Sequence, residues 1–166
     1  MPRAIYPGSF DPVHNGHVDI ATRASAVFDE IVVAIYDRPP SKTLMFGTEE
    51  RVQLFSEATE NITNIRVTPF TGLAPDFARA SDADFILRGL RAGFDFELEF
   101  EMALMNRKLA PDIEIVSFMS SLEYQYLSST LLKDIARLGG DIREFVPDHV
   151  ASALKHRMKG PAKAPK

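Results

Sequence analysis

The chain has 166 residues, of which 45% are hydrophobic and 25% charged, with a formal net charge of −4 and no cysteine. This size suits one domain with its own core, and the missing cysteines exclude disulfides, thiolate zinc sites and a cysteine nucleophile. The acidic balance argues against long nucleic acid as a partner, and no apolar run approaches the roughly 20 residues that cross a membrane. Because the N-terminus shows no export signal, we expect a cytoplasmic protein.

Strand and helix patterns alternate along the chain. Short apolar runs predict strands at 3–6, 31–36, 65–70, 85–87 and 113–118, and helical spacing predicts helices at 17–28, 49–58, 73–80, 94–109, 129–138 and 148–158. Thr48 is expected to cap the second helix, and Ser128 or Ser129 the fifth. Such alternation indicates repeated βαβ crossovers. We therefore expect an α/β fold, a single doubly wound Rossmann-like domain over 1–158 with a five-stranded parallel sheet, and a flexible basic tail over 159–166.

The loop after the first strand is the first candidate site, because ligands of such folds bind outside the carboxyl ends of the strands. Gly8 and Gly16 let its backbone approach a ligand closely. A helix begins near Gly16, so free N–H groups and the positive end of the helix dipole face the loop. His14 and His17 are three residues apart and can point to the same side of the first turn. The loop therefore predicts an anion site with two imidazole donors.

The same His-x-x-His spacing also fits two ligands of a metal ion. A catalytic metal site needs about three protein ligands, and no third is evident near His14 and His17. The other histidines, His149 and His156, fall in the last helix and the tail region. A metal-dependent hydrolase remains open as an alternative, as does a non-catalytic nucleotide-binding module.

The tetrapeptide His14-Asn15-Gly16-His17 resembles the Thr/His-x-Gly-His motif of the nucleotidyltransferase superfamily. Residues 8–12 resemble the usual approach to that motif. Here the motif follows the first predicted strand and opens the first predicted helix, which is the structural context that it requires.

Three further segments resemble one member family, the phosphopantetheine adenylyltransferases, and the resemblance runs from about residue 4 to 154. The segments are Ser41-Lys42 with Met45-Phe46 and Glu49-Glu50-Arg51; Arg88-Gly89-Leu90-Arg91, placed directly after the fourth predicted strand, with Asp95-Phe96-Glu97 and Glu99; and Tyr124 to Thr130, followed by Leu131-Leu132-Lys133. Met105-Asn106-Arg107 also resembles the family.

The resemblance implies that the protein transfers the adenylyl group of ATP to 4′-phosphopantetheine, giving dephospho-coenzyme A and pyrophosphate. We expect a direct in-line displacement without a covalent enzyme intermediate. The attacking phosphate monoester has a second pKa of about 6, so it needs no general base at pH 7. The family also implies a homohexamer. We expect Mg²⁺ to be carried by ATP, held mostly by phosphate oxygens and water, because the sequence shows no dedicated protein site for it.

The resemblance assigns residues to each role. Catalytic roles fall to His17, Lys42 and Ser9. The phosphopantetheine site would contain Ser9, Lys42, Arg88 and, through its backbone, Ala74. The ATP site would contain Ser9, Phe10, His14, His17, Gly89, Leu90, Arg91, Glu99, Tyr124, Gln125, Tyr126, Leu127, Ser128, Ser129 and Thr130.

Other interpretations of these segments exist. The guanidinium groups of Arg88 and Arg91 suit phosphate oxygens, but either could instead pair with a nearby carboxylate among Asp95, Glu97 and Glu99. A second enzyme reading keeps the fold and changes the acceptor to nicotinamide mononucleotide or glycerol phosphate, against which the segments 88–91 and 124–130 argue. An aminoacyl-tRNA synthetase is disfavoured, because the chain is short and lacks a Lys-Met-Ser-Lys-Ser loop.

Overall fold

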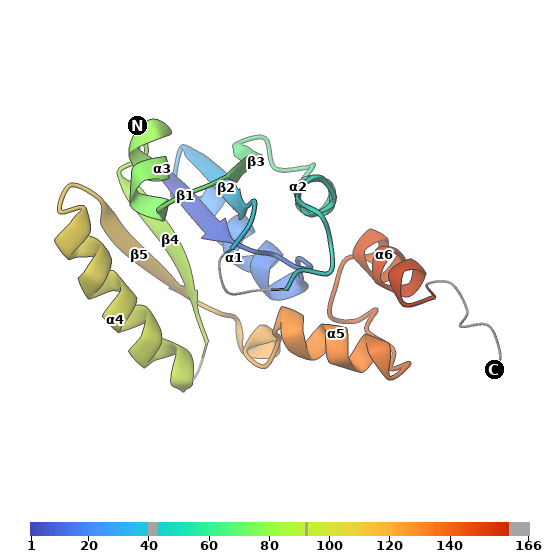
Figure 1. The fold of residues 1–166 in the computed structure, drawn as a ribbon. Coiled ribbons are helices and arrows are strands. Elements are labelled where there is room, and N and C mark those ends of the chain that lie inside the picture. Colours follow the sequence, from blue (N-terminus) through green and yellow to red (C-terminus); the bar gives the residue numbers. More distant parts are fainter. Residues whose placement is uncertain (40–42, 92, 160–166) are drawn as a thin grey trace.

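A computed structural model describes residues 1–39, 43–91 and 93–159. In these residues a sheet of parallel strands is covered by helices on both faces (Figure 1). The strands are β1 (Arg3–Gly8), β2 (Glu30–Tyr36), β3 (Ile65–Phe70), β4 (Phe85–Leu90) and β5 (Glu114–Met119). The helices are α1 (Asn15–Ser25), α2 (Thr48–Ala58), α3 (Ala74–Ala80), α4 (Phe94–Leu109), α5 (Ser129–Arg137) and α6 (Asp148–Met158), and a 3-10 turn, η1 (Leu122–Tyr124), precedes α5.

The strand order is β3-β2-β1-β4-β5, and each neighbouring pair is parallel. The chain first builds outward from β1 through β2 to β3, and then crosses back to add β4 and β5 on the other side. The direction of winding therefore reverses between β1 and β4, which is where doubly wound sheets bind ligands. The predicted fold class, with a five-stranded parallel sheet, is confirmed.

Side chains of each strand alternate between the two faces of the sheet, and the core divides accordingly. On one face Ile5, Val32 and Ile86 pack with Ala78 of α3 in one buried cluster. Helix α4 packs against β4 and β5. This side of the sheet thus carries α3, and α4 covers the two strands added last (Figure 1).

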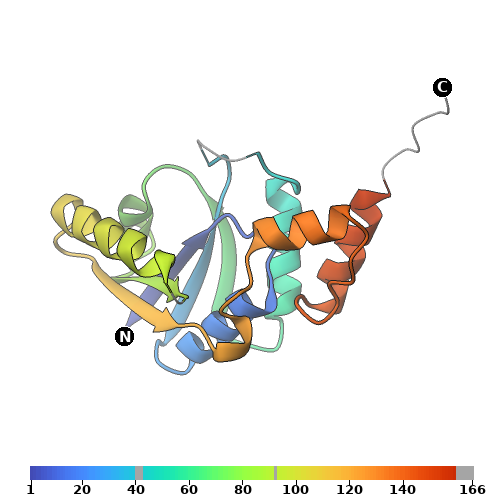
Figure 2. The same cartoon turned by 90° about the horizontal axis from the view of Figure 1, so that it is seen from below.

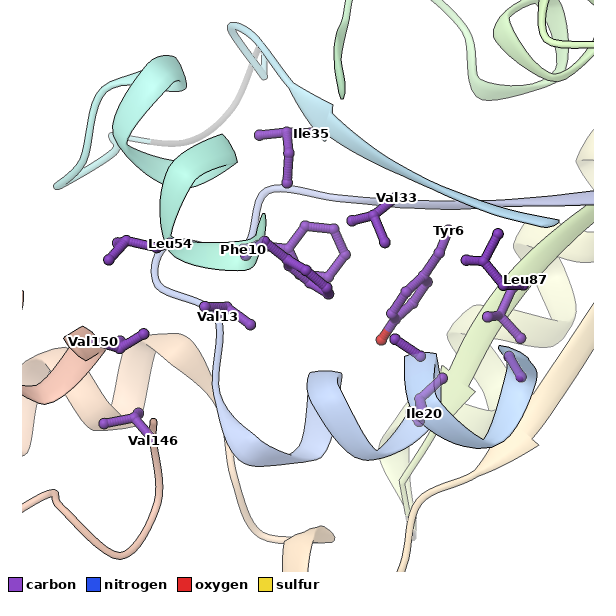
Figure 3. Close-up of a cluster of buried hydrophobic side chains, with 14 of the residues drawn as sticks. Tyr6, Phe10, Val13, Ile20, Val33, Ile35, Leu54, Leu87, Val146 and Val150 are labelled. Atoms are coloured by element: carbon purple, nitrogen blue, oxygen red, sulfur yellow. The ribbon is translucent and has the colours of Figure 1, made fainter. Parts of the chain in front are cut away.

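The larger cluster fills the opposite face. Figure 3 shows Tyr6 and Leu87 of the sheet beside Ile20 of α1. Phe10, from the loop after β1, extends the same cluster toward α2, and Val150 joins it from α6. Helices α5 and α6 pack on each other beside this loop (Figure 2), so the C-terminal part of the chain completes the wall around the first loop.

Strands β1 and β4 are longer than predicted. Pro7 and Gly8 continue the pairing of β1 with β2. Proline is tolerated there because β4 pairs with β1 only at Ala4 and Ile5. The missing N–H of Pro7 therefore removes no hydrogen bond to β4.

Strand β4 continues to Leu90 because its last three residues pair with the segment 117–119 of β5. Arg88, Gly89 and Leu90 were predicted to follow the strand, and this prediction is wrong. They are the last residues of β4, and Arg91 is the one that leaves the sheet.

The predicted cap of α2 was also wrong, whereas Ser128 does cap α5 with its side-chain oxygen. Gly47 is the capping residue of α2, and its N–H donates to Oε2 of Glu50 at 2.8 Å. The Thr48 hydroxyl is engaged elsewhere, since it donates to Oδ1 of Asp37 at 2.6 Å. The hydrogen bond to Asp37 therefore takes the place of the capping bond that Thr48 was expected to form.

Helix α1 begins at Asn15 and ends at Ser25, instead of spanning 17–28. The N–H groups of Val27 and Phe28 both bond the carbonyl of Ala24, which closes a turn into β2. Phe28 remains in the core, so the apolar spacing continues beyond the C-terminal end of the helix. The other elements begin or end within two residues of their predicted bounds.

Helix α6 ends at Met158, the last residue of the predicted domain. Residues 160–166 lie outside the described part, so the division into domain and tail stays a prediction. Among the helices of the described residues, none combines the length and the apolar character that crossing a membrane requires.

Candidate active site

A cavity of about 590 Å³ opens at the carboxyl ends of the strands, around the point where the winding reverses. Its size is within the range of small-ligand sites. It is lined by residues 6–11, 14, 16, 17 and 20 of β1, its loop and α1; by 43 and 44; by 88, 89, 91, 95 and 99; by 120 and 124; and by 128–130, 133 and 137 of α5.

The first loop brings a backbone turn, an aromatic ring and a histidine together. A Cβ at Gly8 would lie 2.7 Å from the ring of Phe10, so only glycine allows this approach. Phe10 adopts a left-handed backbone conformation with φ of 46°, and its buried ring meets the His17 ring edge-on at 4.8 Å. Ser9, between Gly8 and Phe10, lines the cavity. The predicted placement of Ser9, Phe10 and His17 around one site is what the structure has.

His14 and His17 form a reciprocal cap at the start of α1. Nδ1 of His14 accepts from the backbone N–H of His17 at 3.3 Å, and Nδ1 of His17 accepts from the backbone N–H of His14 at 3.2 Å. A ring nitrogen that accepts a hydrogen bond carries no proton, so Nε2 is the proton-bearing nitrogen of each neutral ring. Both imidazoles are therefore set to donate from Nε2, which realises the pair of donors that the motif predicts.

His14 is held in its neutral form. The pKa of His14 is lowered to about 3, mainly by burial and in addition by the positive charge of Arg91. Its side chain is only marginally exposed, in agreement with this cause. At neutral pH His14 is thus a fixed dipole and hydrogen-bond donor, and not a cation.

Arg88 points from β4 into the cavity and is clamped by α4. Its Nε and Nη2 donate to the two carboxylate oxygens of Glu99 at 2.7 and 2.6 Å, and its Nη1 donates to the carbonyl of Pro7 at 3.3 Å. Burial lowers the pKa of Arg88, but the hydrogen bond and charge of Glu99 outweigh it, so the pKa is raised overall. The carboxylate pairing that the sequence left open is real, and it lies at the site rather than on a remote surface.

Arg91 is the second clamped guanidinium. It pairs with both oxygens of Asp95, in the first turn of α4, and its Nη1 donates to the carbonyl of Leu127. Leu127 immediately precedes the cap of α5, so Arg91 links the end of β4 to the start of that helix. Gly89, between the two arginines, packs against α1, because a Cβ there would lie 2.4 Å from Cδ1 of Ile20.

The N-terminus of α5 forms the wall opposite α1. Ser128 accepts from the N–H of Leu131 at 3.1 Å, and the Ser129 hydroxyl donates to the carbonyl of Pro12 at 2.8 Å. Ser128, Ser129 and Thr130 all line the cavity. The starts of α1 and α5 thus both face one cavity, and two helix N-termini with nearby arginines favour a polyanion such as a triphosphate.

Some predicted residues lie beside the cavity rather than in it. Tyr124 lines it, whereas Gln125 donates to the carbonyl of Ser120 and Tyr126 packs edge-on against Phe145. Leu127 is buried and contributes its carbonyl to Arg91.

Two other predicted residues are not brought into the site. Leu90 is buried and lines a smaller cavity between α4 and β5. Ala74 begins α3 and packs against the second core cluster, away from the main cavity. Lys42 lies outside the described residues, so its role stays a prediction.

No role was predicted for Asp11, Lys133 or Arg137, which line the same cavity. The carboxylate of Asp11 is almost fully buried and accepts from Nζ of Lys133 at 2.8 Å. A signal existed for α5: Lys133 and Arg137 are four residues apart after the predicted cap, and such pairs share one helix face. No comparable signal marked Asp11, because its partners are distant in sequence.

The possibility of a protein metal site can be checked against the histidines and carboxylates of the described residues. Among the described residues no group of three or more histidines and carboxylates is arranged to hold one. The cavity carboxylates are engaged with cations, in the pairs Asp11–Lys133, Asp95–Arg91 and Glu99–Arg88.

This architecture, a doubly wound sheet with the His-x-Gly-His loop and capped helix starts at its switch point, is that of a nucleotidyltransferase-like protein. The family model described as cytidylyltransferase-like matches residues 5–135, which run from β1 through most of α5. The chain therefore belongs to the cytidylyltransferase-like family.

Curated relatives narrow the assignment. The phosphopantetheine adenylyltransferase of Roseiflexus sp. (strain RS-1) is 50% identical over 155 residues, covering 93% of this chain and 96% of that protein. Those of Clostridium botulinum (strain Eklund 17B / Type B) and Thermomicrobium roseum are 50% and 48% identical over 159 residues, covering 96% and 95% of this chain and 99% and 95% of those proteins. Within the wider family, the chain belongs to the phosphopantetheine adenylyltransferases.

Proposed function

We propose that this protein transfers the adenylyl group of ATP to 4′-phosphopantetheine, giving dephospho-coenzyme A and pyrophosphate, a step of coenzyme A biosynthesis. The observation that carries the proposal is the convergence of separate segments on one cavity. Residues of the His-x-Gly-His loop, of the Arg-Gly-Leu-Arg segment and of the start of α5 line the same space. The names and high identity of the relatives support the choice of acceptor.

The reaction needs alignment rather than proton removal. An oxygen of the acceptor phosphate attacks the α-phosphorus of ATP, the new P–O bond forms, and the bond to the β-phosphate oxygen breaks to release pyrophosphate. A phosphate monoester with a second pKa of about 6 is already largely dianionic at pH 7. The site therefore contributes positioning and charge stabilisation, as is general for phosphoryl-type transfer.

The described residues divide these tasks. His17 donates from Nε2 to an oxygen on the α-phosphorus as charge builds there, and the Ser9 hydroxyl supplies a second donor. Arg88, held by Glu99, receives the acceptor phosphate, while Arg91 and the N-terminus of α5 receive the outer phosphates of ATP. Lys42 is proposed as a further cation of the acceptor site.

Mg²⁺ is proposed to enter with ATP, held by phosphate oxygens and water. It would offset the charge of the triphosphate that the cations of the site do not reach. The pairing of each cavity carboxylate of the described residues with a cation is in keeping with this arrangement.

We further propose a cytoplasmic homohexamer. Helix α4 exposes a set of large apolar side chains that water does not favour, and contact with other copies would cover them. They are Phe96, Leu98, Phe100, Met102, Leu104, Met105 and Leu109, each at least half exposed. Light scattering coupled to size-exclusion chromatography measures the assembly, and a monomer would contradict this part of the proposal.

The activity is tested by pyrophosphate release from ATP and Mg²⁺ with purified protein. We expect release with 4′-phosphopantetheine and dephospho-coenzyme A as the second product, and none with nicotinamide mononucleotide, glycerol phosphate or no acceptor. CTP in place of ATP controls for the nucleotide, and metal analysis of the same sample controls for tightly bound zinc. Release with a different acceptor would replace the substrate assignment, and ATP binding without release would indicate a non-catalytic module.

A further inference from the structure

Arg51, in the first turns of α2, is completely buried although its guanidinium is always charged. The structure surrounds it with acceptors instead of a paired carboxylate. Its guanidinium donates to four backbone carbonyls, those of Ser9 at 2.9 Å, Tyr36 at 2.7 Å, Asp37 at 3.1 Å and Phe46 at 3.1 Å. A fifth hydrogen bond, 3.1 Å long, reaches the hydroxyl of Thr48.

A buried charge is expensive unless every donor is satisfied, and an apolar side chain would fill the same space at lower cost. Burial lowers the pKa of Arg51, and the charges of Asp11 and Asp37 act in the opposite direction. Because an arginine gives five donors in a rigid fork, it can hold several carbonyls at fixed positions at once. The position therefore favours a role in fixing geometry over a role in stability alone.

Two of the carbonyls that Arg51 holds, those of Ser9 and Phe46, belong to two loops of the active site. Ser9 follows β1 and lines the cavity, and Phe46 lies near the end of the loop in which Thr43 and Leu44 line it. Asp11 reinforces the connection, since its carboxylate accepts from the N–H groups of Met45 at 2.8 Å and Phe46 at 2.9 Å. Arg51 itself is not among the residues that line the cavity.

We propose that Arg51 is a positioning residue for adenylyl transfer, which locks the Ser9 loop and the wall at 43–46 in register across the ends of β1 and β2. It acts through the placement of Ser9 and does not touch substrate. The inference rests on the proposed function in one respect, that the Ser9 hydroxyl contacts the phosphates of ATP.

A double-mutant cycle between Arg51→Lys and Ser9→Ala tests this role. A lysine cannot reach the acceptors of two loops at once, and misplacement by about 1 Å can cost up to a hundredfold in rate, so we expect kcat to fall by about tenfold to a hundredfold. In the Ser9→Ala background the same substitution should cost far less, because the group that Arg51 places is already gone. Effects on kcat that simply multiply would overturn the proposal.

Stability is controlled with Ile113→Ala, a buried residue of the opposite core cluster. This variant should lower the midpoint of thermal unfolding at least as much as Arg51→Lys while leaving kcat unchanged. If Arg51→Lys does not fold, Thr48→Val removes one acceptor of Arg51 and enters the same cycle, with a smaller loss of kcat expected.

The cycle is also measured as the dissociation constant of ATP by titration calorimetry, which needs no acceptor. If the wild-type protein bound ATP but transferred nothing to 4′-phosphopantetheine, the proposed function would be contradicted. The double-mutant cycle could still be measured in the dissociation constant of ATP. If the two substitutions changed the dissociation constant of ATP independently while the fold stayed intact, the positioning role of Arg51 would be contradicted. The proposed function would not be affected by that result.

Discussion

The imidazole rings of His14 and His17 stack 3.6 Å apart, and the Nδ1 atom of each accepts a hydrogen bond from the backbone N–H of the other residue. One motif thus does two things. It satisfies N–H groups at the start of α1 that would otherwise lack partners, and it fixes Nε2 as the proton-bearing nitrogen on both rings. The reciprocal cap explains how both histidines are held rigidly at the start of α1.

Replacing His17 separates capping from catalysis. His17→Ala removes the Nε2 donor and half of the cap, so we expect turnover to fall by about a hundredfold to a thousandfold, corresponding to about 2.7–4 kcal/mol. Loss of the cap should lower the free energy of unfolding by about 1 kcal/mol. Steady-state kinetics and urea unfolding measure the two effects.

His17→Gln is the matched control, because a glutamine at this helix position can reach back to the capping backbone N–H. It should recover the stability but not the turnover. A folded His17→Ala variant with near-normal turnover would rule out the role assigned to this imidazole.

His14 makes stability depend on pH in a definite direction. Its pKa is about 3 in the folded state and 6.5 as the ordinary value, so between these pH values the unfolded chain binds a proton that the folded protein refuses. The contribution of His14 to the free energy of unfolding is therefore fully present above about pH 6.5. Below that pH the free energy of unfolding should fall by up to about 1.4 kcal/mol per pH unit.

The measurement is urea unfolding from pH 4.5 to 7.5, for the wild type and for His14→Asn. Asparagine also caps helices but does not titrate in this range, so the variant should show a shallower slope. Other titrating groups cancel in the comparison. Parallel slopes for the two proteins would mean that His14 is not the buried neutral group described here.

Much of the fold could be predicted from local patterns. The apolar run at 31–36 and the long helical spacing at 94–109 gave β2 and α4 nearly as observed, because each pattern reports burial along one element. The same holds for the switch-point site: strand alternation alone predicts that loops after strands meet at one edge. Within that edge, Ser9, His17, Arg88 and Ser128 are found around one cavity.

What failed depended on partners far away in the chain. β4 was predicted three residues short because Gly89 reads as a loop residue, whereas pairing with β5 keeps it in the sheet. Thr48 was predicted to cap α2, but its hydroxyl donates to Asp37, eleven residues earlier in the chain. Asp11 and Lys133 are 122 positions apart, so no window of sequence could show that one buried carboxylate joins α5 to the first loop.

The Arg88–Glu99 pair gives a prediction that separates the two substrate sites. Glu99→Gln leaves Arg88 with the carbonyl of Pro7 and an amide that matches its fork poorly. We expect a loss of about 1–3 kcal/mol in the free energy of unfolding, since a partly buried charged donor loses its acceptor. The KM for 4′-phosphopantetheine should rise by roughly tenfold, because bidentate alignment of Arg88 is lost.

Asp95→Asn is the comparison variant, since Asp95 holds Arg91 in the same manner one turn earlier on α4. It should raise the KM for ATP and leave that for 4′-phosphopantetheine nearly unchanged. Initial-rate measurements with each substrate varied in turn distinguish the two. If both variants changed the same KM, the division of the arginines between acceptor and ATP would be wrong.

Gly89 and Ile20 form a packing contact that sets how closely α1 approaches β4. Because a Cβ at position 89 would lie 2.4 Å from Cδ1 of Ile20, a buried side chain, Gly89→Ala should lower the free energy of unfolding by about 1–3 kcal/mol through overpacking. Ile20→Val removes the atom that collides, at a cost of about 0.5–1.5 kcal/mol by itself.

The double variant decides whether this contact is the cause. With Cδ1 removed, the alanine methyl group occupies the vacated space, so the two destabilising effects should not add. The double variant should be at least about 1 kcal/mol more stable than the sum of the two single effects predicts. Urea unfolding of the four proteins gives the coupling directly. Additive costs would show that the strain at position 89 arises elsewhere, for example in the pairing with β5. Because α1 carries His17 on its first turn, the same four proteins should also show kcat recovering in the double variant together with stability.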